Sequence, residues 1–277
     1  MKECTYYGLY PEGRYHNFIM KVKSIFVAAT GQHVGKTTSC LGVLTGLRRH
    51  FPNGKINYMK PVGQKYVTVD GVKVDKDVVL FKKWFDIAAT PSQMSPVVIP
   101  AGYTRDYISG LNDRQSQIDD IVRAHEAVSE GCDMMVIEGT GHSGVGSVIE
   151  VNNAQVAKEL GAKVVLIGPG GLGSSFDELE LNRMMFQNYG VEVAGVILNK
   201  CTPSKIPMLR DYFSRLVEAR WPGIPLLGLV PDNSFLTTST LADLRKHLDA
   251  DLLAGEECED IHYDNRAVMM VSGGVFA

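Results

Sequence analysis

One stretch near the N-terminus, residues 25–38, constrains the fold more than any other. It reads IFVAATGQHVGKTT: an apolar run, a loop with two glycines, and Gly-Lys-Thr-Thr opening a helical pattern. A strand–loop–helix unit of this kind turns backbone N–H groups toward a phosphate, and the helix N-terminus adds partial positive charge. The strict motif has glycine where Thr30 stands, but the strand before the loop and the helix after it predict a phosphate-binding loop.

The residue types within this loop predict how a nucleotide would be held. The Lys36 ammonium can reach the β- and γ-phosphates, and the Thr37 hydroxyl can bind Mg²⁺. His33 is open to two interpretations, a contact to a phosphate or substrate and a plain solvent-facing loop residue. The predicted nucleotide-binding residues of the loop are Thr30, Gly31, Gln32, His33, Val34, Gly35, Lys36, Thr37 and Thr38.

Short apolar runs alternate with helical patterns along most of the chain. The runs are mostly continuous rather than alternating, which is typical of strands buried on both faces of a parallel sheet. We therefore predict an α/β fold, a doubly wound, mostly parallel sheet flanked by helices. The expected strands are 24–29, 56–60, 133–138, 163–167, 193–198 and 226–230, and the expected helices are 36–50, 77–86, 114–130, 153–160, 177–189 and 204–219.

Further polar residues follow the predicted strands, where ligands of such sheets bind. Lys60 ends the second strand, and Glu138 ends the run MMVIE. A carboxylate directly after an apolar strand is suited to contact Mg²⁺ or its water. Asp75 and Asp77 precede a helical pattern, where either could also be a helix cap. Lys60 could equally be a solvated lysine at a strand end.

Composition excludes several classes of protein. Among 277 residues, 28 basic and 31 acidic side chains give a net charge of −3, without the basic surplus expected of a nucleic-acid-binding protein. The five cysteines are scattered and suggest neither a zinc site nor a disulfide framework. No apolar run approaches the roughly 20 residues that span a bilayer. We expect a soluble, cytoplasmic protein with neither nucleic acid nor membrane as partner.

The chain divides into three expected parts. Residues 1–20 are rich in tyrosine without clear periodicity and are predicted to be an N-terminal extension. Residues 21–250 form the nucleotide-binding domain. Residues 251–277 begin acidic and polar and then turn apolar. This last segment is either a terminal strand of the main sheet or the start of a further domain that continues beyond Ala277.

Taken together, residues 23–245 resemble the dethiobiotin synthetase-like family of P-loop NTPases. They also resemble the nucleotide-binding N-terminal region of long bacterial phosphotransacetylases, and more distantly cobyrinic acid a,c-diamide synthases and MinD-type ATPases. The resemblance rests on TGQHVGKTTSCLGV at 30–43, KPVGQ at 60–64, VDKD at 74–77, EGTG at 138–141, GGLGSS at 170–175 and ILNK at 197–200. The loop departs from the synthetases, which have glycine where Ala29 and His33 stand and aspartate at Gly31.

The resemblance implies a role for each matching residue. Lys36, Lys60 and Glu138 would be catalytic, with Lys60 facing the acid substrate and the transferred phosphate. Mg²⁺ would be held by Thr37, Asp77 and Glu138. Asn199 would read the adenine edge, and Pro231 would flank the base. ATP and Mg²⁺ are the implied cofactors, and a homodimer is common in the family.

Two functions remain open at this point. In the first, an ATP- and Mg²⁺-dependent enzyme phosphorylates a carboxylate or carbamate, and an amine attacks the mixed anhydride. In the second, a regulatory ATP-binding module without ligase activity, similar to the phosphotransacetylase region, passes nucleotide occupancy to another domain. The partner would be a small-molecule substrate in the first and an allosteric nucleotide in the second. A MinD-like switch is less favoured, because such loops usually carry an early lysine that is absent between Thr30 and Gly35.

Overall fold

The computed structural model describes residues 22–263. The expected extension at 1–20 and the end of the segment 251–277 lie outside the described residues. Contacts divide the chain into two units, Met1–Val230 and Pro231–Ala277, whereas the sequence suggested a boundary at residue 250. No helix in the described part of the chain is both long and apolar enough to cross a membrane.

A six-stranded sheet forms the centre of the first unit, in the order β10-β9-β8-β1-β7-β2. Its inner strands pair in parallel, β1 with both β7 and β8, β7 with β2, and β8 with β9. The predicted doubly wound, mostly parallel sheet is thus confirmed. The strands are β1 (Lys23–Ala29), β2 (Ile56–Met59), β7 (Met134–Glu138), β8 (Lys163–Pro169), β9 (Val193–Cys201) and β10 (Leu226–Pro231).

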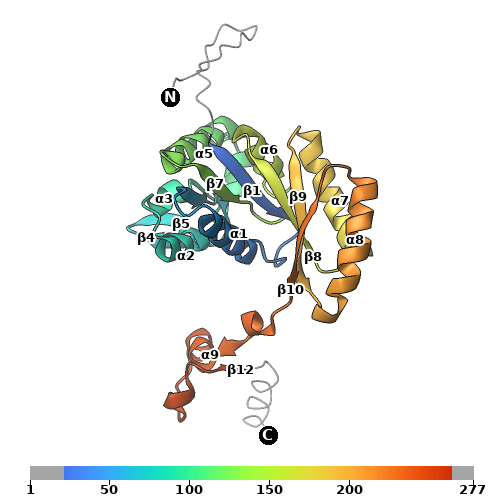
Figure 1. Ribbon diagram of the computed structural model, residues 1–277. Coiled ribbons are helices and arrows are strands. Elements are labelled where there is room, and N and C mark those ends of the chain that lie inside the picture. The colour runs from blue at the N-terminus through green and yellow to red at the C-terminus, as the bar shows by residue number, and fades with distance from the viewer. Residues whose placement is uncertain (1–21, 264–277) are drawn as a thin grey trace. The chain divides into compact units, whose positions relative to one another are not determined.

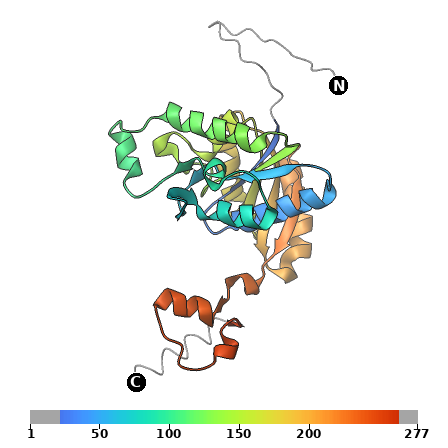
Figure 2. The same ribbon diagram turned by 90° about the vertical axis from the view of Figure 1, so that its left-hand side faces the viewer.

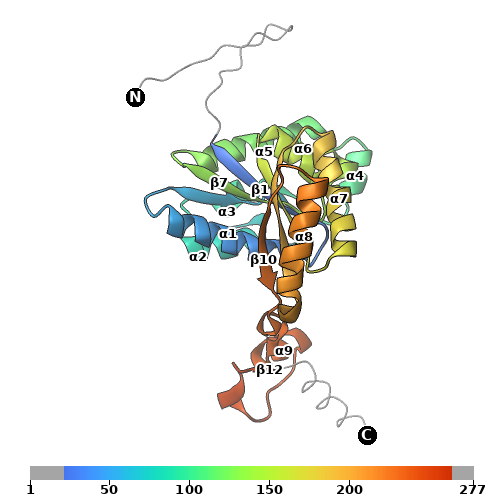
Figure 3. The same ribbon diagram turned by 45° about the vertical axis from the view of Figure 1, so that its right-hand side comes forward.

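Helices cover both faces of this sheet and bury its apolar strands. The sheet lies between α1 on one side and α5 with α6 on the other (Figures 1 and 3). Figure 2 shows the same layering from the side, with the green α5 above the strands and the blue α1 below. The main helices of the first unit are α1 (Lys36–His50), α2 (Lys76–Phe85), α5 (Arg114–Ser129), α6 (Asn153–Glu159), α7 (Gly173–Asn188) and α8 (Ile206–Arg220).

Shorter elements connect β2 to α5 and were not predicted. An antiparallel hairpin, β4 (Tyr66–Val69) and β5 (Val72–Asp75), precedes α2. β3 (Val62–Gly63) pairs in parallel with β6 (Val97–Val98). The helices α3 (Pro91–Met94) and α4 (Tyr103–Ile108) lie in the same stretch. β3 and the hairpin connect β2 to α2, and α3, β6 and α4 connect α2 to α5.

The second unit, described up to residue 263, is small. Its strands β11 (Ser239–Thr240) and β12 (His262–Tyr263) pair antiparallel, and the helix α9 (Leu241–Leu248) lies between them in the sequence. Thr240 caps α9 through a capping box with Asp243. None of the side chains described in this unit is buried, so the core of the described protein belongs to the first unit.

Candidate functional site

The loop between β1 and α1 lies where the strand order reverses. From β1 the chain crosses to β2, returns through β7, and then continues to β8 on the opposite side of β1. Ligands of doubly wound sheets bind at such a switch point, beyond the carboxyl ends of the strands. Figure 1 shows α1 leading away from this end of β1. The phosphate-loop prediction therefore falls at the position that the topology favours.

Lys36, the first residue of α1, reaches back across the loop. Its Nζ donates hydrogen bonds to the carbonyl oxygens of Gly31 at 2.8 Å and Gly141 at 2.7 Å. Burial lowers the pKa of Lys36 to about 8, and the nearby Glu138 carboxylate opposes that shift. The hydrogen bonds of the ammonium are thus made to neutral carbonyls. A partly buried cation with such partners can form strong charge-assisted hydrogen bonds to an anionic ligand.

Thr37 links the loop to two carboxylates. Its hydroxyl lies 2.8 Å from Glu138 Oε1 and 3.3 Å from Asp77 Oδ2. Asp77 lies in the first turn of α2, and Glu138 is the last residue of β7, paired with Val27 of β1. The structure therefore brings together the three residues predicted to hold the metal, from three different elements.

Glu138 is fixed by a residue that the sequence did not single out. The buried Tyr58 hydroxyl donates to Glu138 Oε2 at 2.8 Å, and its ring stacks on Phe81 at 3.6 Å. Burial raises the pKa of Glu138, while the charge of Lys60 and the hydroxyls of Thr37 and Tyr58 oppose that rise. In the apolar strand INYM a tyrosine is read as core, so only its hydrogen bond to Glu138 in the folded chain identifies this role.

Lys60 follows β2 and lies among three carboxylates. Its Nζ is 2.5 Å from Asp77 Oδ2, 3.1 Å from Asp75 Oδ1 and 3.7 Å from Glu138 Oε1. Burial alone would lower the pKa of Lys60, but the carboxylates of Glu138, Asp75 and Asp77 outweigh it and raise the pKa above its ordinary value. Lys60 is accordingly a buried, charged residue rather than a solvated lysine at a strand end.

Asn199, near the end of β9, supports the loop from the other side. Its buried Nδ2 donates to the Val34 carbonyl at 2.8 Å. Gly35 lies directly beside it, with φ of 96°, and a Cβ at Gly35 would lie 2.1 Å from Asn199 Nδ2. The amide predicted to read adenine therefore contacts the loop backbone, and its adenine contact stays a prediction.

Several other residues were also predicted to contact the nucleotide. Gln32, His33 and Thr38 are exposed. His33 has φ of 61°, a left-handed conformation that favours glycine. The Thr30 hydroxyl donates to Glu178 Oε2 at 2.9 Å. Pro231 is the exposed last residue of β10 and the first residue of the second unit.

A buried amide holds the loop after β7. Asn153, at the start of α6, accepts from the Thr140 N–H at 2.9 Å and donates to the carbonyls of Thr140 and His142. These bonds fix the Gly141 carbonyl to which Lys36 donates. The sequence EGTG at 138–141 thus supplies both a carboxylate and a backbone acceptor to the site.

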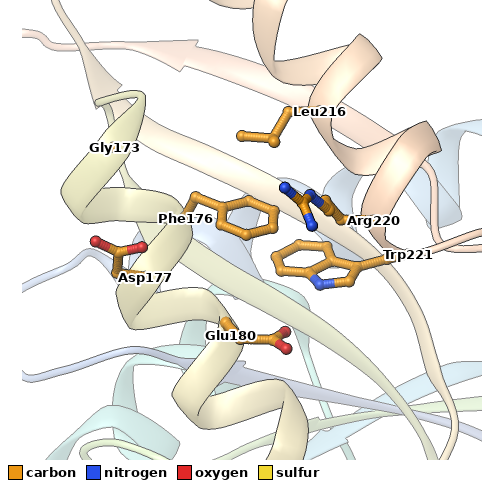
Figure 4. A pocket seen from close by; sticks show the side chains of 7 residues that line it. All are labelled: Gly173, Phe176, Asp177, Glu180, Leu216, Arg220 and Trp221. Carbon is orange, nitrogen blue, oxygen red and sulfur yellow. The ribbon is translucent and has the colours of Figure 1, made fainter.

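A separate pocket of about 520 Å³ lies between α7 and α8. The Phe176 ring stacks on the Trp221 indole at 4.3 Å, and Figure 4 shows the Arg220 side chain beside both rings. Glu180 and Asp177 line it from α7. None of its lining residues belongs to the phosphate loop, and the sequence did not predict it.

The donor set at the loop suits a hard cation. One hydroxyl and two carboxylates converge there, and Mg²⁺ prefers oxygen ligands and commonly completes its shell with substrate phosphates and water. Within residues 22–263, no group of three or more His, Cys, Asp or Glu side chains is arranged to hold a metal by itself. The residues therefore fit Mg²⁺ bound together with a nucleotide better than a metal bound alone.

A family model described as "AAA domain" matches residues 23–240. Among curated proteins, the chain is 25% identical over 244 residues to a phosphate acetyltransferase of Nitrosomonas europaea, covering 85% of this chain and 33% of that protein. It is 28% identical over 254 residues to a phosphate acetyltransferase of Deinococcus radiodurans, covering 86% and 33%. The chain thus spans about a third of the length of these relatives.

Solved structures with a related arrangement are more remote. A plasmid partition protein from Borrelia burgdorferi has a TM-score of 0.47 and 13% identity, covering 77% of this chain and 91% of that chain. The tyrosine kinase domain BceF has a TM-score of 0.40 and 14% identity, covering 64% and 68%.

Proposed function

This chain belongs to the AAA domain family, and from that premise we propose that it binds ATP with Mg²⁺ and transfers the γ-phosphoryl group to an acid. The observation that supports this most directly is the convergence of Thr37, Lys60, Asp77 and Glu138 at the end of β1. A loop that only held a nucleotide would not need a buried ammonium among carboxylates beside it.

The loop residues would take the phosphates. Gly35 is the N-cap of α1 and Lys36 to Thr38 form its first turn, so their N–H groups have no acceptor within the helix and are available to a phosphate. Lys36 would exchange its bonds to two carbonyls for the γ-phosphate. Thr37, Asp77 and Glu138 would hold Mg²⁺, which when bound would supply positive charge to the phosphoryl oxygens.

Lys60 would act on the acceptor side. Its raised pKa keeps it charged at neutral pH, and a fixed ammonium stabilises the negative charge of a phosphoryl group during transfer. A carboxylate or carbamate acceptor would approach the same cation. This is the chemistry of the dethiobiotin synthetase-like class, in which an amine then attacks the mixed anhydride.

A second candidate function is a nucleotide-binding module that controls another domain. The curated relatives that favour it are phosphate acetyltransferases, of which this chain spans about a third. A module of this kind would bind Mg²⁺-ATP with the same loop but would show no turnover that depends on an amine. The two candidates differ in acceptor-dependent ADP release.

The test is binding and turnover by wild type and Lys36→Ala. We expect wild type to bind Mg²⁺-ATP and Lys36→Ala to lose on the order of 10²–10³ in turnover, whereas Lys158→Ala, at an exposed lysine of α6, should change neither. ADP released only with bicarbonate and diaminopelargonate would support the ligase. Tight binding with turnover that ignores the diamine would favour the module, and absence of nucleotide binding would contradict both.

A further inference from the structure

Three carboxylates surround one ammonium at Lys60, so the cluster carries excess negative charge. Lys60 Nζ lies within 3.7 Å of oxygens from Asp75, Asp77 and Glu138. Two of these carboxylates also contact the Thr37 hydroxyl, while Asp75 has no such contact in the structure. Asp75 is therefore the carboxylate of the cluster that contacts Lys60 but does not contact Thr37, the residue predicted to bind the metal.

Asp75 is more deeply buried than a helix cap requires. Its side chain is fully buried, and Oδ1 accepts from the Asp77 N–H at 2.9 Å as the N-cap of α2. Its second oxygen, Oδ2, has no hydrogen-bond partner among the described residues. A Cβ at Gly63 would lie 2.7 Å from Oδ2, so the carboxylate occupies space that a side chain at residue 63 would fill. A cap needs only one oxygen, which serine, threonine or asparagine would supply without burying a charge.

Binding of Mg²⁺ would change the partners of Lys60. Asp77 Oδ2 is 2.5 Å from Lys60 Nζ and 3.3 Å from Thr37 Oγ1, so the same oxygen serves the ammonium and the predicted metal position. Two cations repel each other and cannot share that oxygen at full strength. Once Asp77 and Glu138 coordinate a metal, Asp75 is the carboxylate of the cluster that still pairs with Lys60.

We propose that Asp75 is a positioning residue, the fixed counter-ion that retains the Lys60 ammonium beside the phosphoryl group when Mg²⁺ takes Asp77 and Glu138. The inference rests on the proposed function, because it assumes Mg²⁺ at Thr37. Asp75 acts on the reaction through Lys60 and touches neither nucleotide nor acceptor. Without its charge, Lys60 would hold Asp77 and Glu138 more tightly and compete with the metal.

The experiment measures the Mg²⁺ concentration that gives half-maximal binding of a fluorescent ATP analogue. Asp75→Asn keeps a capping oxygen and removes the charge. We expect it to raise the half-saturating Mg²⁺ concentration by on the order of tenfold, while affinity for the analogue in EDTA changes by less than about twofold. A purely structural cap would leave the Mg²⁺ dependence unchanged, and that result would overturn the proposal. Asp75→Thr, a second capping side chain, repeats the test if the asparagine variant does not fold.

A matched background separates an effect through Lys60 from a direct effect on the metal. In Lys60→Met there is no ammonium to compete, so adding Asp75→Asn should shift the Mg²⁺ dependence much less than in wild type. An equal shift in both backgrounds would show that Asp75 acts on the metal directly and would overturn the proposal. Failure of wild type to bind the analogue at any Mg²⁺ concentration would instead contradict the proposed function.

Discussion

Gly35 is the loop position at which the structure leaves least room for a side chain, so we predict that Gly35→Ala damages both stability and binding. Its φ of 96° lies in the left-handed region, where an L-residue costs roughly 1–2 kcal/mol. The added Cβ would also lie 2.1 Å from Asn199 Nδ2, which bonds to the Val34 carbonyl. Losing that buried bond costs about 1–3 kcal/mol. Together the two effects should lower the free energy of unfolding by roughly 2–5 kcal/mol.

The assay is urea unfolding followed by circular dichroism, together with binding of a fluorescent ATP analogue. Gly46→Ala is the matched control, because Gly46 lies inside the same helix with no atom within 4 Å of an added Cβ. It should stabilise the protein by about 0.5–1 kcal/mol through helix propensity. Only Gly35→Ala should weaken nucleotide binding.

A double mutant separates the two contributions to this cost. In an Asn199→Ala background the collision partner is gone, so Gly35→Ala should cost only the roughly 1–2 kcal/mol of the left-handed backbone. If Gly35→Ala is as harmless as Gly46→Ala, or if its cost is the same in both backgrounds, the reasoning from the Asn199 contact is wrong.

Two further predictions concern the charged groups of the site. Burial lowers the pKa of Lys36 to about 8, and a bound phosphate favours the charged lysine. Affinity for ADP in EDTA should therefore be roughly constant between about pH 7 and pH 8, where the terminal phosphate of ADP is already ionised. Above pH 8 it should fall by about tenfold per pH unit, and fluorescence titrations should find no such decline in Lys36→Ala. Tyr58→Phe keeps the stacking on Phe81 but removes the hydrogen bond to the buried Glu138. It should lower the free energy of unfolding, measured in urea, by roughly 1.5–3 kcal/mol. The control is Tyr103→Phe, because Tyr103 is a half-buried tyrosine whose hydroxyl bonds to a neutral amide. If Tyr58→Phe destabilises the protein no more than this control does, the assigned contact to Glu138 is wrong.

The main sheet could be predicted because its strands are continuous apolar runs. All six expected runs are strands of the sheet, and α1 has the predicted bounds, Lys36–His50. The start of α7 was placed too late, because the residues after Gly173 are small and polar and were read as loop. A strand buried on both faces leaves a continuous apolar run in the sequence. The start of a helix can be read only where a typical N-cap residue, such as serine, threonine, aspartate or asparagine, precedes it.

The hairpin β4–β5 shows a signal that was present and not used. Asp70-Gly71 separates two alternating segments, and both residues have positive φ, 50° and 78°. Asp-Gly between alternating runs is a strong sign of a two-residue hairpin turn. Reading it would have placed Asp75 at the end of a strand, directly before the helix predicted to begin at Asp77.

The contacts between side chains of the site could not be predicted from the sequence, for a different physical reason. Strand ends could be assigned to one edge of the sheet, so Lys36, Lys60 and Glu138 could be expected to approach one another. Whether a buried carboxylate pairs with a lysine or a hydroxyl depends on distances of about 3 Å, and those depend on loops whose course no periodicity reveals. Asp75 could be read from sequence only as a cap, which is one of its two contacts. Its second contact, to Lys60, exists because the fold brings the end of β5 to the residue that follows β2. A buried charge becomes tolerable only through such non-local pairing.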